Sequence, residues 1–135
     1  MDDRHHGSCL CGAVRYEVTG GFDAFFLCHC KYCQKDTGSA HAANLFSRKA
    51  ELSWIDGHDH IQSYTVPETR HQKAFCKTCG SAVPYTQMDG KLLVVPAGSL
   101  ETPVSIRPNA HIMLGCKANW DDGLDEIEGL DGLPK

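Results

Sequence analysis

The sequence predicts a mostly β protein that forms one domain. Three observations support this prediction. Short apolar segments are separated by turn residues along most of the chain, and one of them alternates between apolar and charged side chains. The length of 135 residues suits one domain with a modest core, and no internal repeat or low-complexity linker divides it. We therefore expect a single domain over residues 1–135, with its core in about 7–120 and an acidic tail in 121–135.

The first elements can be placed from local patterns. Residues 14–18 read VRYEV, in which apolar and charged side chains alternate as in a strand with one buried face. The glycines at 20–21 mark a turn. Residues 24–27 form an aromatic run, which predicts a second strand that leads directly into CHCKYC. Residues 31–37 are predicted to make a helical turn before Gly38.

The rest of the chain continues in short segments. Further strands are predicted at 41–46, 51–55, 61–66, 82–86, 92–95 and 111–114. Residues 121–135 are acidic and contain scattered Leu and Ile, which predicts a solvated tail, with the covering of a domain edge as the alternative. The ligand spacing of an EF-hand is absent from this tail, so calcium binding is not expected.

Composition and charge exclude several classes of function. The hydrophobic share of 41% and charged share of 22% are ordinary for a globular protein. A net charge of −4 without a basic stretch argues against nucleic-acid binding. The apolar runs are too short to span a bilayer, and the first residues lack the pattern of a secretory signal. We therefore expect a cytoplasmic protein with reduced cysteines that bind metal.

The first cysteine constellation contains two pairs, each closed by a glycine: Cys9-x-Cys11-Gly12 and Cys76-x-x-Cys79-Gly80. Side chains two apart on an extended chain point the same way, and a CxxC segment achieves this through a tight turn that glycine permits. Four thiolates complete a tetrahedral zinc site, so a structural zinc is expected. The alternative is that Cys9 and Cys11 are buried apolar residues and that Cys76 and Cys79 form a redox pair.

The second constellation supplies only three thiolates, from Cys28, Cys30 and Cys33. A zinc ion with three protein ligands keeps an open fourth position. Such an ion can bind an external thiolate or polarise a carbonyl group, which are the two halves of thiol addition to an aldehyde. The sequence therefore predicts that chemistry occurs at this second site.

Other interpretations of the second constellation remain open. Cys30 and Cys33 can form a dithiol switch, or a fourth protein ligand can close the site. The candidates for that ligand are His29, His41, His111 and Cys116. His29 is expected to point away from its two cysteine neighbours, and Cys116 is expected to be a small buried residue. Four other histidines are expected to be exposed: His5, His6, His58 and His60.

Five segments, taken in order, resemble the glutathione-dependent formaldehyde-activating enzyme family: GSCLCGAVRYEV, CHCKYCQKDTGSA, FCKTCGSAVPY, AGSLE and the P-x-x-H-I of residues 108–112. They cover about residues 7–120, and the order CxCG, CHCxxC, CxxCG is a specific signature. The resemblance implies a β-tent fold of short antiparallel strands stapled by zinc. It also implies two Zn²⁺ ions per chain, on the two cysteine sets already described.

The resemblance further implies a reaction. Family members join formaldehyde reversibly to glutathione to give S-hydroxymethylglutathione, formally a carbon–sulfur lyase reaction with a small thiol as partner. Catalysis would then occur at a zinc held by Cys28, Cys30 and Cys33, which stay unmodified. Gln34 and Ser39 match the flanking pattern and are expected to donate hydrogen bonds to substrate or ligand sulfurs, with a turn-stabilising role as the alternative.

Two features differ from what the resemblance leads one to expect. No basic cluster for the carboxylates of glutathione is evident, and the candidates serve only if the fold gathers them: Arg48, Lys49, Arg70 and Lys73. Residues 67–76, PETRHQKAFC, lack the Ser-Gly expected near this position. The alternative functions are a non-catalytic, zinc-stapled binding module and a thiol redox protein that uses Cys30 and Cys33.

Overall fold

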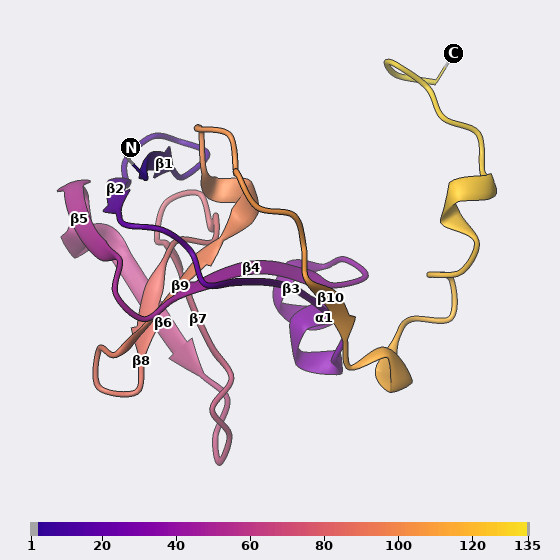
Figure 1. Ribbon diagram of the computed structural model, residues 1–135, viewed down its shortest axis with the longest axis horizontal. Coiled ribbons are helices and arrows are strands. Elements are labelled where there is room, and N and C mark those ends of the chain that lie inside the picture. Colours follow the sequence, from indigo (N-terminus) through magenta and orange to yellow (C-terminus); the bar gives the residue numbers. More distant parts are fainter. Residues whose placement is uncertain (1–2, 135) are drawn as a thin grey trace.

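The computed structural model describes residues 3–134, and these residues form three small sheets and a short helix (Figure 1). The sheet orders are β1-β2-β5, β10-β3-β4-β9-β8 and β6-β7. The strands are β1 (Arg4–Ser8), β2 (Arg15–Thr19), β3 (Ala24–Cys28), β4 (Ala42–Ser47), β5 (Glu51–Asp56), β6 (Ile61–Thr65), β7 (Gln72–Cys76), β8 (Tyr85–Gln87), β9 (Leu92–Pro96) and β10 (Ala110–Ile112). Within the described residues only β10 and β3 pair in parallel, and the mostly β fold is confirmed.

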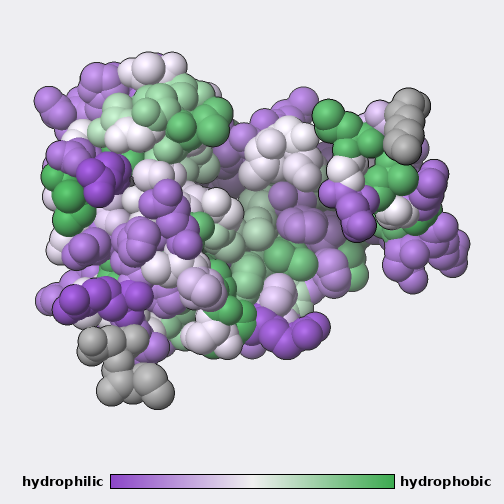
Figure 2. Space-filling view, turned by 90° about the horizontal axis from the view of Figure 1, so that it is seen from above, coloured by the Kyte–Doolittle hydropathy of each residue, from purple (hydrophilic) through white to green (hydrophobic). Residues whose placement is uncertain are grey.

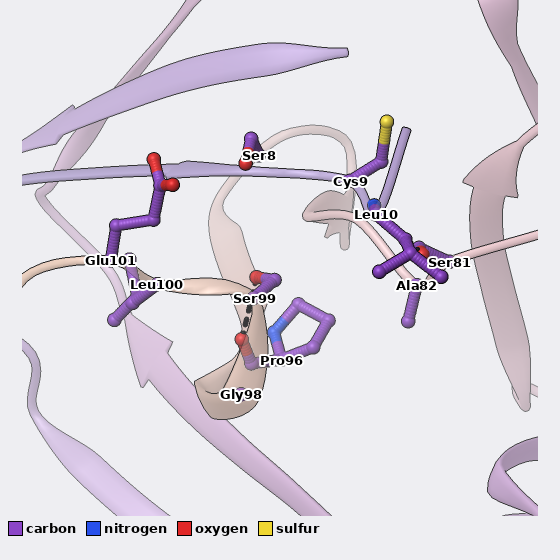
Figure 3. A pocket seen from close by; sticks show the side chains of 10 residues that line it. All are labelled: Ser8, Cys9, Leu10, Ser81, Ala82, Pro96, Gly98, Ser99, Leu100 and Glu101. Atoms are coloured by element: carbon purple, nitrogen blue, oxygen red, sulfur yellow. Dashed lines mark hydrogen bonds between the residues drawn. The ribbon is translucent and has the colours of Figure 1, made fainter. Parts of the chain in front are cut away.

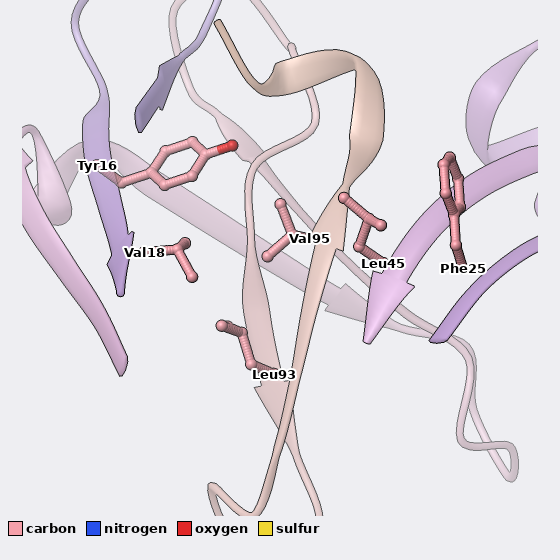
Figure 4. Packing of buried hydrophobic residues seen from close by; sticks show 6 residues of the cluster. All are labelled: Tyr16, Val18, Phe25, Leu45, Leu93 and Val95. Carbon is pink, nitrogen blue, oxygen red and sulfur yellow. The ribbon is translucent and has the colours of Figure 1, made fainter. Parts of the chain in front are cut away.

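The main core lies between the three-stranded and the five-stranded sheet. Alternation in β2 places Tyr16 and Val18 on the buried face, as the sequence pattern predicts. They meet apolar side chains from the neighbouring sheet (Figure 4): Phe25, Leu45, Leu93 and Val95. Each fully buried side chain of this size stabilises the fold by about 1.5–3 kcal/mol.

A second, smaller core lies under the first cysteine pairs. It contains Cys9, Val14, Ala74, Cys76 and Val83. The half-buried Trp54 of β5 packs against both cores and connects them. Cys9 and Cys76 are therefore part of the hydrophobic packing, in addition to any metal they hold.

The helix α1 (Lys31–Thr37) has the bounds expected from the sequence. It begins at Cys30, whose Sγ accepts the backbone N–H of Cys33 at 3.3 Å. It ends at Gly38, which adopts a left-handed φ of 66° and donates its N–H to the carbonyl of Gln34. Two of the three cysteines in the second constellation are thus fixed by the start of a helix.

Two strands and one buried histidine were not expected. β1 and β7 were not predicted, because their polar side chains give no clear apolar alternation. β8 is shorter than its predicted range. The prediction that His5 is exposed is wrong, because His5 is only 7% exposed on the inner face of β1. Its Nδ1 lies 2.8 Å from Oγ1 of Thr102, and its ring packs on Phe22.

The chain leaves the sheets after β10. Residues 122–134 are exposed, as a solvated tail predicts, and they stand away from the sheets (Figure 1). Asp121 differs from them because its side chain is mostly buried against His29. In the described part of the chain, no helix has both the length and the apolar character required to cross a membrane.

Candidate metal centres

The first cysteine constellation comes together at one point. The Sγ atoms of Cys9, Cys11, Cys76 and Cys79 all lie within 4.8 Å of one another. The separation from Cys9 to Cys11 is 3.7 Å, and that from Cys11 to Cys76 is 3.8 Å. Sulfur atoms bonded to one tetrahedral zinc at about 2.3 Å lie about 3.8 Å apart. The four thiol groups therefore fit a tetrahedral metal ion and leave no position for another ligand.

Two tight turns bring these sulfur atoms together. The backbone N–H of Gly12 donates to the carbonyl of Cys9, and that of Gly80 donates to the carbonyl of Cys76. Gly12 has a φ of 84° and Gly80 a φ of 78°, in the left-handed region that side chains rarely adopt. The glycine that closes each cysteine pair is therefore required by the turn itself.

Ser81 connects the two turns. Its Oγ accepts the backbone N–H of Leu10 at 3.0 Å and lies 3.3 Å from Sγ of Cys79. Hydrogen bonding with Ser81 lowers the pKa of the Cys79 thiol to about 5. Because thiolate is the form that binds metal, this contact favours the ligand state of Cys79.

The second constellation also comes together, but with three members. The Sγ atoms of Cys28, Cys30 and Cys33 lie within 4.8 Å of one another. Cys28 ends β3, Cys30 precedes α1, and Cys33 lies in the first turn of α1. Among the described residues 3–134, no histidine, carboxylate or further cysteine joins this group. The site is therefore suited to a metal ion with one position open to an external ligand.

The three thiols differ in acidity. Although burial acts in the opposite direction, the N–H of Cys33 donates to Sγ of Cys30 and helps to hold the pKa of Cys30 below its ordinary value. Burial raises the pKa of Cys28 and that of Cys33, because a buried thiolate lacks the water that would stabilise its charge. A cation in this group would favour the thiolate form of all three, so the donor set suits a thiophilic metal such as zinc.

His29, His41 and His111 form a cluster next to the Cys28–Cys30 loop. His29 is 2% exposed, and its Nε2 lies 2.9 Å from Nδ1 of His111. On the other side of the ring, Nδ1 lies 3.0 Å from Oδ2 of Asp121, close but not aligned for a hydrogen bond. The ring of His41 lies 5.0 Å from that of His29, and burial lowers the pKa of His41. His29 thus stays outside the cysteine group, as strand alternation predicts.

Gln34 and Ser39 occupy different environments. The Gln34 amide donates to the carbonyl of His29 at 2.7 Å and to that of Cys116 at 2.9 Å. It therefore ties α1 to the segment after β10. Ser39 is exposed beyond the end of α1, and no hydrogen bond of its hydroxyl is present within the described residues. Cys116 itself is half-buried and lies outside both cysteine groups.

Asp121 is the site residue that sequence reasoning missed. It lies in a stretch of acidic residues, and no local signal distinguishes it from Asp122. The difference arises only because the segment after β10 returns to His29. Asp122, by contrast, is an exposed residue that pairs with Lys117 at 3.3 Å.

Replacing Asp121 by alanine is expected to weaken metal binding at the second constellation by about tenfold, because the loop between Cys28 and Cys30 loses the group that holds His29. Competition with a chromogenic chelator, with native mass spectrometry to count bound zinc, would measure this. Asp122→Ala is the matched control, and the first constellation serves as an internal reference. Equal zinc affinity in the two variants would contradict a positioning role for Asp121.

Two hollows lie near the cysteine constellations. One of about 530 Å³ borders the four-cysteine group (Figure 3), yet the Cys9 sulfur there points away from Ser99 and Pro96. The other, of about 190 Å³, lies between α1 and strands β4, β7 and β9. The two hollows adjoin, since they share three lining residues, and together they are called the cleft: Ala82, Pro96 and Gly98. The smaller hollow lies near the second constellation, because Thr37 in its lining donates a hydrogen bond to the carbonyl of Cys33 and Ala42 in its lining pairs with Cys28.

Tyr85 identifies the smaller hollow as the one beside the second constellation. Burial raises the pKa of Tyr85 to about 12, with further contributions from the charges of Asp36 and Cys33. Tyr85 therefore lies within electrostatic range of the three-cysteine group and keeps its proton near neutral pH. Tyr85 lines this hollow, and no hydrogen bond of its hydroxyl is found among the described residues.

The fold gathers one of the four basic candidates beside this hollow. Lys73 lines it and pairs with Asp36 at 3.2 Å, while His71 contacts the same carboxylate at 3.0 Å. Arg48 and Lys49 follow β4 and do not line either hollow. Arg70 also lies outside both.

The chain is similar to known proteins both in sequence and in fold. The sequence model described as "Glutathione-dependent formaldehyde-activating enzyme" matches residues 4–115. A protein of Halomonas elongata, provisionally named as such an enzyme, is 32% identical in a 124-residue alignment that covers 84% of this chain and 77% of that protein. A crystal structure of a Rhodobacter sphaeroides protein resembles the fold with a TM-score of 0.57 at 23% identity, and the match covers 78% of this chain and 98% of that one.

Proposed function

The chain belongs to the glutathione-dependent formaldehyde-activating enzyme family, and from this premise we propose that it is a zinc-dependent enzyme of the carbon–sulfur lyase type. Its substrates would be a small thiol and an aldehyde, with glutathione, formaldehyde and S-hydroxymethylglutathione as the specific set. The observation that carries the proposal is the three-cysteine group, which has no fourth ligand among residues 3–134 and lies near a hollow. The reduced thiols that this site needs favour the cytoplasm as its location.

Two zinc ions per chain would have separate roles. Cys9, Cys11, Cys76 and Cys79 would hold one as a structural staple. Cys28, Cys30 and Cys33 would hold the other, which when bound supplies a positive charge that lowers the pKa of a substrate thiol. The protein thiols bind the ion and are not consumed.

The reaction itself balances without an oxidant or reductant. The substrate sulfur loses its proton and forms a bond to the aldehyde carbon, the π electrons of the carbonyl move to its oxygen, and that oxygen gains a proton. Tyr85 is suited to stabilise the developing negative charge on this oxygen, since its hydroxyl is free and protonated. The reverse reaction releases the aldehyde and regenerates the thiol.

The two adjoining hollows of the cleft would together suit a peptide-like thiol. The inner part of the cleft, about 190 Å³, would hold the reacting thiol and aldehyde, and the outer part, about 530 Å³, would hold the remainder. Lys73 offers a cation at the inner part, and Glu101 offers an anion at the outer part. Glutathione carries carboxylates at both ends and an ammonium group at one end, which these two side chains complement.

Exchange NMR spectroscopy on glutathione and formaldehyde is the direct test. The rate of adduct formation with the zinc-loaded protein should exceed the uncatalysed background and should fall to that background after chelation. An unaccelerated rate would defeat the proposal. A reversible disulfide between Cys30 and Cys33, found by thiol counting, would instead support the redox alternative.

Replacing Tyr85 by phenylalanine is expected to slow the catalysed exchange by at least about tenfold, because a hydrogen bond to the developing oxyanion is lost. Stability should change little, since the hydroxyl has no partner in the described structure. Tyr64→Phe is the matched control, because Tyr64 is exposed and does not line the cleft. Exchange rates that are equal in the two variants would show that Tyr85 does not act on the substrate.

A further inference from the structure

The last part of the described chain, residues 122–134, forms a C-terminal arm with unusual exposure. Its large apolar side chains recur every three residues and are exposed: Leu124, Ile127, Leu130 and Leu133. Every backbone hydrogen bond that these residues make is local, from Glu126 to Gly123 and from Ile127 to Leu124. In Figure 2 a lobe with several hydrophobic patches projects from the body beside a hollow.

The root of the C-terminal arm is held firmly. The Gln34 amide binds the carbonyl of Cys116, Ala118 is buried, and Asp121 lies against His29. Lys117 pairs with Asp122 at the start of the arm. Because the root is fixed, the arm departs in one direction, away from the β6–β7 hairpin of its own chain (Figure 1).

An arm of this kind is not stabilised by its own chain. Burying an apolar side chain of this size contributes about 1.5–3 kcal/mol, and none of the four gains it here. Contiguous exposed apolar side chains generally mark a contact surface. The family match ends at residue 115, so the arm lies beyond the part that the chain shares with the family. The C-terminal arm is therefore available as a contact surface.

The body of the chain offers a surface with complementary chemistry. A recess of about 360 Å³, here called the aromatic recess, is lined by Tyr32, Lys35, Asp36, Tyr64, Val66, His71 and Lys73. Tyr32 is 47% exposed and Tyr64 is 55% exposed, both high values for aromatic side chains. Lys35 makes no ion pair within residues 3–134, so its charge is available.

The charges of the two surfaces are opposite. The C-terminal arm carries five acidic side chains and, over residues 122–134, no basic one: Asp122, Asp125, Glu126, Glu128 and Asp131. The aromatic recess presents Lys35 and Lys73 against the single carboxylate of Asp36. Apolar side chains flanked by acids thus match aromatic side chains flanked by lysines.

We propose that the chain forms a two-fold dimer in which the C-terminal arm of each copy lies in the aromatic recess of the other. When the two copies exchange their arms, the same arm-to-recess contact forms twice and buries both arms. Such exchange is a common route to closed dimers. A second copy is the partner that fits, since the fixed root directs the arm away from its own recess. The dimer does not depend on the reaction proposed above.

Sedimentation velocity of the full chain at micromolar concentration tests the proposal. The wild type should have about twice the 14.8 kDa mass of one chain. Lys35→Glu should yield a monomer, whereas the control Lys49→Glu, on the exposed turn after β4, should remain a dimer. Circular dichroism and the zinc count of each variant verify that it is folded.

A charge exchange makes the test specific to these surfaces. The arm variant Asp125→Lys with Glu128→Lys should also be monomeric by itself. Mixed with Lys35→Glu, it should form a heterodimer, because each acidic surface then meets a basic one. A monomeric wild type would overturn the proposal. The proposal would also be overturned if both variants remained dimers, or if the two monomeric variants did not form a heterodimer when mixed.

Discussion

Cys76→Ser is expected to release the first zinc and to leave the chain largely unfolded at ambient temperature. The four-cysteine group joins two turns that are 65 residues apart, from Cys11 to Cys76. Structural zinc sites contribute about 10–16 kcal/mol of binding free energy in zinc-finger peptides. Domains of this size are stable by only about 5–15 kcal/mol, so the loss of this metal is comparable to the whole stability. Cys76 is also fully buried in the smaller core.

Native mass spectrometry and far-UV circular dichroism would measure both parts of this effect. The variant should lack the zinc of the first constellation and lose its β signal, and chelation of the wild type should act in the same direction. Cys116→Ser is the matched control, since Cys116 lies outside both cysteine groups. A folded Cys76→Ser chain with an undiminished zinc count would show that the first constellation is not a structural metal site.

The cysteine groups were predictable because spacing alone constrains them. Two cysteines separated by one residue on an extended segment point the same way, and this geometry does not depend on the remainder of the fold. The same holds for α1, since the cap at Cys30 and the left-handed Gly38 are local features. Both groups of Sγ atoms assemble as the sequence predicts.

Contacts that depend on the path of the chain were not predictable in the same way. The pattern of β1 reads as polar, and only its pairing with β2 shows that His5 faces the interior. Asp121 meets His29 across 92 residues of sequence, and Tyr85 comes to line the same hollow as Asp36 and Thr37 of α1 only in the folded chain. Residues of this kind have no signal in a single sequence, because their neighbours are set by tertiary structure.

The two constellations differ in their importance for the fold because their surroundings differ, although both consist of thiols. Cys9 and Cys76 are packed into a core, so their loss affects the whole fold. The second group lies at the end of β3 and the start of α1, where Cys28 and Cys30 are half-buried. The pairing of β3 with β4 extends along the full strand, that with β10 covers Phe26–Cys28, and neither requires a cysteine at the last position. The second group can therefore lose its metal without losing the fold.

Cys28→Ser is accordingly expected to reduce the zinc count by one ion, to leave the circular dichroism spectrum unchanged, and to bring glutathione–formaldehyde exchange down to the uncatalysed rate. The physical reason is that two thiolates and a hydroxyl hold zinc poorly, since a neutral hydroxyl is a weaker ligand than thiolate. Cys116→Ser again serves as control and should retain both ions and the wild-type rate. A folded Cys28→Ser chain that has lost its second zinc and still exchanges at the wild-type rate would move the chemistry elsewhere. If the variant retains both ions, the three-cysteine group is not the second metal site, and the aldehyde chemistry assigned to its open position loses its basis.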